Sequence, residues 1–332
     1  MDALRQDVPV TWSLPAVLVP EAGDRGLASA APEALAQRTL AAWDACIELA
    51  GSVDPTTPVR HSIAGAEFAA LGTWPGTRTL DDMRADAVAG HTTIPDRAAP
   101  DIPEHPSGAE LTTALQLSRD NLATWLEGPA TGDHGWQAEG LLITPTIIGP
   151  LPLLTALHGA AYQMALIALD LQTAGALAAP PELLNIGLDA LVDTTGAFAA
   201  RAGVTAAITA RVPERQFGTG AQGADWCTRD ISTSPRNSTG PTVVSDVAGV
   251  LALTSGRADI ARLYRNGSLR LQDIPGLLRW VAVVEEVPSL PGGATLARAG
   301  RYLAGISSLV SRLPRRPGRR RSDREPGSTS ST

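Results

Sequence analysis

The side chains that most often do chemistry are few in this sequence, and their spacing is wide. The two cysteines, Cys46 and Cys227, lie too far apart in the chain for a CxxC metal site, and two cysteines exclude a disulfide-rich scaffold. No two histidines are spaced as HxH or HxxxH, and no HExxH, GxSxG or phosphate-loop motif is present. The segment 218–223 is similar to GxGxxG, but it lacks the strand–turn–helix context of a dinucleotide site. Motifs alone therefore point to no common catalytic class.

The most informative stretch is the apolar segment Gly149–Asp170, GPLPLLTALHGAAYQMALIALD. It resembles the fourth helix of the mycothiol-dependent maleylpyruvate isomerase family, whose N-terminal domain is a DinB-like four-helix bundle. Arg38–Asp44 resembles the first helix of that family. Three further pieces resemble its C-terminal, sterol-carrier-like domain: residues 223–226, 243–257 and 267–271. The resemblance covers most of residues 32–290.

The resemblance implies a zinc site that binds and activates the thiol of mycothiol. The family carries Glu-x-x-x-His-x-x-Asp on its fourth helix, where a Glu and a His four apart can reach one Zn²⁺ with a third ligand from the second helix. Alignment on Asp170 places Gln163 and Ile167 at the two ligand positions. Ser62 falls at the third position, in the piece Ser-Ile-Ala-Gly. Because isoleucine cannot coordinate a metal and neutral glutamine is a poor ligand for zinc, we interpret the metal site as eroded.

Two histidines offer an alternative metal site. His61 lies one residue before the aligned position, and His158 lies on the fourth helix, although on a different face from Gln163. Both histidines could equally be structural. His158 and Gln163 are also the candidates for contact with a cofactor.

Asp170 and Arg257 are the candidate catalytic residues. Arg257 follows a glycine at the end of an expected helix and could bind an anionic substrate or thiol. Its alternative is a helix-terminal arginine favoured by the helix dipole. The alternative for Asp170 is a structural hydrogen-bond acceptor within the bundle. Cys227 is expected to be buried and inert.

Composition and charge limit the function classes. The chain has 332 residues, 44% of them hydrophobic and 18% charged, which excludes a disordered protein and predicts about two domains. Lysine is absent, which we interpret as the mark of a GC-rich genome such as that of an actinobacterium. Residues 312–332 hold seven arginines against two acids, so this tail carries +5 and the remainder carries −12 of the net −7. An acidic body argues against nucleic-acid binding by the folded part.

The chain order predicts an α+β protein, with an N-terminal four-helix bundle (DinB-like) followed by a smaller mixed α/β, sterol-carrier-like domain. Periodicity predicts bundle helices at 32–50, 62–71, 107–127 and 152–177, with a helical turn at 80–88. Ser107 and Glu110 fit a capping box at the start of the third of these helices. After Pro180 the pattern predicts a helix at 182–202, strands at 204–212, 223–231 and 269–272, helices at 245–253 and 274–284, and a flexible turn at 217–223. Ser245 is the expected N-cap of the helix at 245–253. The predicted divisions are 1–31 as an irregular lead-in, 32–179, 180–291, 292–313 as an amphipathic helix, and 314–332 as a disordered tail.

Location follows from the absence of obvious sorting signals. The N-terminus shows no signal peptide, so a cytoplasmic protein is expected. The apolar run at 153–169 is shorter than a membrane span and carries polar residues, which favours a buried helix. The expected helix at 296–313 leads into the arginine-rich tail, so residues 296–321 could contact an anionic membrane surface.

These observations leave three functional hypotheses. The first is a maleylpyruvate-isomerase-like protein with an eroded metal site that binds a small apolar or anionic ligand between its domains. The second is an active thiol-dependent isomerase or transferase with a non-standard metal site. The third is a membrane-surface interaction protein that uses its arginine-rich tail. Expected partners are a small-molecule ligand or a thiol. Zinc and mycothiol are the cofactors that the family resemblance implies.

Overall fold

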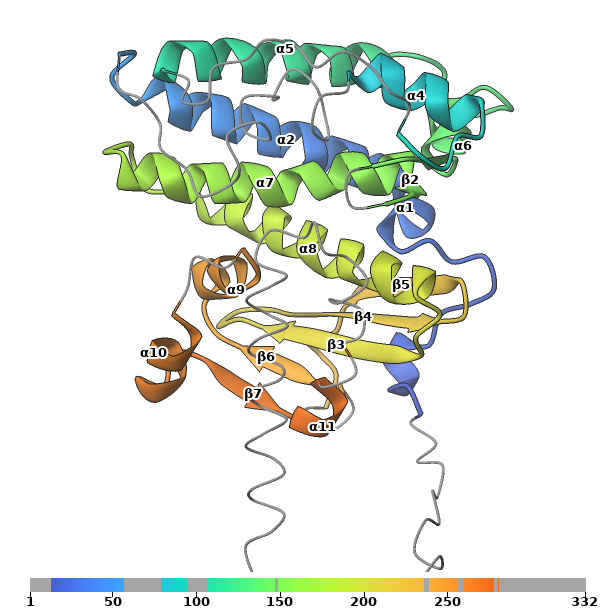
Figure 1. Cartoon of the computed structure of the whole chain (residues 1–332), viewed down its shortest axis with the longest axis vertical. Helices are drawn as coiled ribbons and strands as arrows, with labels where there is room; N and C mark the ends of the chain where they lie inside the picture. Colours follow the sequence, from blue (N-terminus) through green and yellow to red (C-terminus); the bar gives the residue numbers. More distant parts are fainter. Residues whose placement is uncertain are drawn as a thin grey trace, which may run out of the picture.

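The structure is a computed structural model that describes residues 13–56, 79–94, 107–146, 149–235, 239–255, 259–277 and 280. N-terminal helices pack on one another, and a five-stranded mixed sheet with helices follows (Figure 1). The predicted α+β class is therefore confirmed. Several predictions fall outside the described residues: the second bundle helix with His61 and Ser62, Arg257, the amphipathic helix at 292–313 and the tail at 314–332.

The helical part begins with two short elements, the 3-10 helix η1 (Ala16–Leu18) and helix α1 (Leu27–Ala30). Helix α2 (Pro32–Gly51) starts at Pro32, whose fixed backbone angle suits a first helical turn. Helices α4 (Leu80–Val88) and α5 (Gly108–Leu126) both begin with capping boxes, and the box of α5 is the predicted Ser107–Glu110 pair. The bundle is completed by α6 (Trp136–Gly140) and by a two-stranded ribbon of β1 (Ile143–Thr144) and β2 (Leu151–Pro152).

Helix α7 (Leu153–Thr173) is the central helix of the protein. Fifteen of its 21 residues are buried, because it packs against α2 on one side and against α8 (Pro181–Arg201) on the other (Figure 1). Among the described residues it alone is long and apolar enough to cross a membrane, and 78% of its most apolar window is buried inside the protein. A helix that is apolar on all sides is typical of a core helix as well as of a span.

Helix α8 lies between the bundle and the sheet, so it contacts α7 above and the strands below (Figure 1). The strands are β3 (Ala206–Arg211), β4 (Gln216–Gln222), β5 (Asp225–Asp230), β6 (Thr242–Val244) and β7 (Arg270–Gln272), arranged in the order β5-β4-β3-β6-β7. Only the β3–β6 pair is parallel. One hydrophobic cluster runs from α2 through α7 and α8 to strands β3–β5.

The predicted flexible turn at 217–223 is wrong, because these residues form the buried strand β4 and the turn at Gly223. Their glycines reflect close packing instead. A Cβ atom on Gly220 would lie 1.9 Å from the carbonyl oxygen of Leu18, so η1 can cross this face of the sheet only where a side chain is missing. Glycine in a strand often marks such an approach by another backbone segment.

The C-terminal elements follow the predicted order, except for the cap of one helix and for two elements that were not predicted, strand β6 and helix α10 (Ile260–Arg265). Helix α9 (Val247–Thr254) is capped by Asp246 and not by the predicted Ser245. Strand β6 was not predicted, since its three residues are too few to show a period. Helix α10 (Ile260–Arg265) follows α9, and α11 (Ile274–Leu277) follows β7.

Candidate functional site

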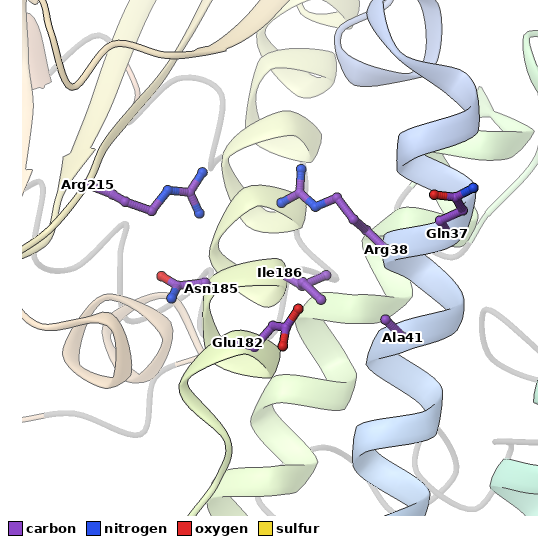
Figure 2. A pocket seen from close by; sticks show the side chains of 7 residues that line it. All are labelled: Gln37, Arg38, Ala41, Glu182, Asn185, Ile186 and Arg215. Atoms are coloured by element: carbon purple, nitrogen blue, oxygen red, sulfur yellow. The ribbon is translucent and has the colours of Figure 1, made fainter.

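A pocket of about 540 Å³ opens between α2, α8 and the β3–β4 turn. Figure 2 shows two guanidinium groups, those of Arg38 on α2 and Arg215 on the turn, pointing toward one another across α8. The remaining lining comes from α2 and α8: Gln37, Ala41, Glu182, Asn185 and Ile186. The pocket therefore lies where the helical part of the protein meets the sheet.

The hairpin between β3 and β4 places Arg215. Val212 and Arg215 exchange backbone hydrogen bonds of 2.9 and 3.4 Å, so only Pro213 and Glu214 form the loop. The guanidinium of Arg215 lies 5.1 Å from the ring centroid of Phe217, a cation–π distance, and its Nε lies 3.4 Å from Asp230. These contacts direct the side chain from the sheet toward α8.

Asp189 on α8 interacts with both arginines. Its side chain is completely buried and forms ion pairs with both Arg38 and Arg215. The Arg215 Nη atoms lie 3.1–3.3 Å from the Asp189 carboxylate oxygens. The side chains of Arg38 and Arg215 are 35% and 27% exposed, so each guanidinium contacts both the buried acid and solvent in the pocket.

Charges of both signs surround Arg38. Burial lowers the pKa of Arg38, the positive charge of Arg215 lowers it further, and Asp193 acts in the opposite direction. Asp189 pairs with Arg38 as well, so buried acids offset part of the positive charge. The guanidinium of Arg38 stays partly exposed in the lining of the pocket.

Asp193 lies one turn beyond Asp189 on α8 and is also completely buried. Its Oδ1 accepts hydrogen bonds from the backbone N–H of Leu27 at 3.0 Å, from Trp226 Nε1 at 3.2 Å and from Thr228 Oγ1 at 2.7 Å. Burial nevertheless raises the pKa of Asp193 to about 6, because desolvation outweighs these hydrogen bonds. Asp193 thus links α8 to α1 and to β5.

His158 on α7 is the third buried polar group near the arginines. Its side chain is 0% exposed, and neither ring nitrogen has a hydrogen-bond partner among the described residues. Burial, and secondarily the charge of Arg38, lowers the pKa of His158 to about 3. The imidazole is therefore neutral at physiological pH, with one donor and one acceptor nitrogen. The hydroxyl groups of Thr155 on α7 and Thr194 on α8 are also buried, and neither has a hydrogen-bond partner among the described residues.

The described candidates Asp170, Gln163 and His158 lie apart on α7. Asp170 is half-buried toward the C-terminal end of α7, twelve residues from His158, which is about 18 Å along a helix. Gln163 is half-buried and lies five residues from His158, so the two point in different directions. The role of Arg257 stays a prediction.

The described residues do not fit a zinc centre. They contain no group of three or more His, Cys, Asp or Glu side chains that could hold a metal ion. Ile167, at one aligned ligand position, is 1% exposed and packs in the hydrophobic cluster of α2, α7 and α8. Both described cysteines are buried, and burial raises the pKa of Cys227 and raises that of Cys46 to about 12. These thiols are therefore protonated at neutral pH.

Sequence reasoning missed the residues that do meet in this pocket. Asp189 and Asp193 were counted within an apolar helix, and Arg215 was placed in a connection. One signal was available: two aspartates four residues apart on an otherwise apolar helix face. Charges on such a face must be paired when buried.

Comparisons with known proteins give two similar solved structures. No family model matches the chain, and no curated protein matches it in sequence. The solved structures are the mycothiol-dependent maleylpyruvate isomerase and a histidine-to-alanine mutant of it. Each is 13% identical to this chain with a TM-score of 0.39, and the match covers 74% of this chain and 93% of that chain. This is the family that the sequence resembles.

Proposed function

We propose that the protein binds a small organic anion, of the carboxylate class, in the pocket between α2, α8 and the β3–β4 turn. The observation that carries the proposal is the convergence of Arg38 and Arg215, which both pair with the buried carboxylate of Asp189. Each guanidinium has five N–H donors in a planar fork, and the pairs with Asp189 and, for Arg215, with Asp230 use only some of these donors. The remaining donors face the pocket, where a second carboxylate would find charge-assisted hydrogen bonds.

The size and the lining of the pocket limit the ligand. A volume of about 540 Å³ lies within the usual range for small-molecule sites. Ala41 and Ile186 supply a short apolar surface, and Asn185 supplies a neutral polar group. Glu182, the one acid among the described lining residues, would repel negative charge placed beside it, so the carboxylates of a ligand must lie toward Arg38 and Arg215. A compact acid with a short hydrocarbon body fits this arrangement.

This proposal treats the protein as a binding module. The thiol-dependent isomerase or transferase stays a prediction from the family resemblance, because the described residues do not supply the aligned metal ligands. Zinc analysis of the purified full-length chain separates the two. Stoichiometric zinc that is lost in a His158→Ala variant would overturn the binding-module proposal.

The direct test is a calorimetric titration of the full-length protein with succinate and with its uncharged diamide, succinamide. We expect saturable binding of succinate and at least about tenfold weaker binding of succinamide, since charged hydrogen bonds are the stronger ones. Arg215→Met should weaken succinate binding by about tenfold or more. Equal binding of the two compounds would overturn the proposal.

Two matched variants separate ligand binding from folding. Arg119→Met removes an arginine that is 34% exposed, is paired with Asp44 and does not line the pocket, so it should leave the affinity unchanged. Glu182→Gln removes the acid in the lining and should strengthen succinate binding. If Arg215→Met fails to fold, unchanged affinity in Glu182→Gln would still count against the proposal.

A further inference from the structure

A second pocket is lined by residues of α4, α5 and α6 and of the segment between α5 and α6. These three helices come together at one end of the helical part (Figure 1). The volume of the pocket is about 210 Å³. Its lining combines two tryptophans, two acids, an arginine, a histidine and polar groups, among them Asp81, Arg84, Trp125, His134, Trp136 and Glu139. We propose that this pocket binds a small organic cation of the trimethylammonium class. The proposal uses no residue of the anion pocket, so each can fail without the other.

The two tryptophans form adjoining walls. The ring centroids of Trp125 and Trp136 lie 6.2 Å apart with an interplanar angle of 60°, so the rings are inclined and not stacked. Trp136 is 7% exposed and packs with Leu35 and Leu154, while Trp125 packs partly buried against the same cluster. Indole faces carry the negative part of the ring quadrupole and attract cations more strongly than other aromatic side chains do.

Glu139 bonds the indole of Trp125 and pairs with Arg84, the one arginine among the described lining residues. Its carboxylate accepts hydrogen bonds from Arg84 Nε at 2.8 Å and Nη2 at 3.2 Å, and from Trp125 Nε1 at 3.1 Å. The Arg84 hydrogen bond, foremost, keeps the pKa of Glu139 below its ordinary value, so this acid stays ionised at neutral pH. The indole of Trp125 is therefore fixed in position before a ligand arrives.

The acids and the arginine that line the pocket leave one negative charge. Since Glu139 and Arg84 offset one another, the exposed carboxylate of Asp81 is the unbalanced charge among them. The hydrogen bond with Glu139 chiefly, and the charge of Asp81 to a smaller extent, raise the pKa of Arg84. Negative charge beside two indole faces favours a cation over an anion or a neutral ring.

The volume sets the size of the ligand. A pocket of about 210 Å³ lies below the range for drug-sized molecules, so it suits a group of only a few heavy atoms. A trimethylammonium group presents methyl groups to the indoles and needs no hydrogen-bond donor or acceptor. Asn121 and Thr124 at the edge can bind a hydroxyl or ester attached to it.

The test compares choline with 3,3-dimethylbutan-1-ol, an uncharged molecule of the same shape, by calorimetry on the full-length protein. We expect saturable choline binding and about tenfold weaker binding of the neutral compound. Trp125→Leu should weaken choline binding by about tenfold, whereas Trp125→Phe, which keeps an aromatic face, should lose less. Equal affinity for choline and its neutral analogue, or no saturable choline binding, would overturn the proposal.

Two additional measurements test the role of the Asp81 charge without a change in folding and identify the source of the cation. Asp81→Asn alters an exposed side chain and should weaken choline binding with no change in the thermal unfolding midpoint; unchanged affinity would count against the proposal. Flotation with phosphatidylcholine vesicles, with and without excess choline, identifies the source of the cation. Vesicle binding that choline displaces assigns it to a lipid headgroup, and choline binding without vesicle binding assigns it to a free solute.

Discussion

The carboxylate of Asp189, completely buried on α8, holds the guanidinium of Arg215 at 3.1 Å across the boundary between the helices and the sheet. The same carboxylate pairs with Arg38 on α2. One acid therefore joins three elements that are distant in the sequence. Because a buried charge is costly unless it is paired, these contacts fix the position of the β3–β4 turn relative to α2 and shape the pocket between them.

Replacement of Asp189 by Asn should destabilise the protein strongly. The amide keeps the shape of the side chain but leaves Arg38 and Arg215 as two facing, partly buried cations. We expect a loss of about 3 kcal/mol in the free energy of unfolding, measured by urea denaturation. The matched control is Asp44→Asn, which breaks the ion pair of an acid that is 54% exposed with Arg119. That variant should lose less than about 1 kcal/mol. Equal losses would show that burial does not set the strength of the Asp189 pairs.

Asp193 should make stability fall as the pH rises. Its pKa is about 6 in the folded state against about 3.9 in an unfolded chain, so the folded protein binds more protons between these values. The stability that protonated Asp193 contributes is fully present below about pH 4 and is lost as the pH rises through about 6. The shift corresponds to about 3 kcal/mol.

The measurement is the unfolding free energy from pH 4 to pH 7 for the wild type and for Asp193→Asn. Other acids, such as Glu139, have a lowered pKa and act with the opposite sign, but they are common to both proteins. The difference curve therefore isolates Asp193. We expect the wild type to lose stability relative to the variant over this range. Parallel curves would contradict the assignment.

The sequence allowed the elements to be predicted where periodicity or a local cap is strong. Helices α2, α5, α7 and α8 appear within a few residues of their predicted bounds, and Ser107 caps α5 as expected. Strand β4 was missed because its glycines are typical of turns, although here they accommodate Leu18. That packing involves residues some two hundred positions apart, which a local pattern cannot show.

The candidate site was predicted less well for the same reason. Family resemblance directed attention to α7, where Gln163 and Asp170 lie away from the arginine pocket. The residues that meet there, Arg38, Asp189 and Arg215, come from three elements, and none carries a motif. Only tertiary structure shows that one carboxylate binds two arginines.

His158 should make the protein sensitive to mild acid. Its pKa is about 3 in the folded state and about 6.5 in an unfolded chain. Below pH 6.5 the unfolded chain therefore binds a proton at His158, whereas the folded protein does not. Stability is thus lost as the pH falls, by about 2 kcal/mol between pH 6.5 and pH 5. In His158→Leu this loss should disappear, which urea denaturation at pH 7 and pH 5 can measure. An equal fall in both proteins would show that His158 is hydrated and able to take up a proton in the folded state.

Gly26 should tolerate no side chain, because it lies directly against the acid that links α8 to α1. Its φ is +58°, and a Cβ atom would lie 2.0 Å from Asp193 Oδ1 and 2.2 Å from Trp226 Nε1. Gly26→Ala must therefore displace the hydrogen bonds of Asp193 in addition to straining the backbone. Gly23→Ala is the control, since Gly23 has a φ of +90° with no atom within 4 Å of the added Cβ. We expect about 1 kcal/mol of destabilisation for the control and clearly more for Gly26→Ala, measured by thermal and urea unfolding. If the two variants lose the same amount, backbone strain alone explains the effect, and the contact between Gly26 and Asp193 is not restrictive.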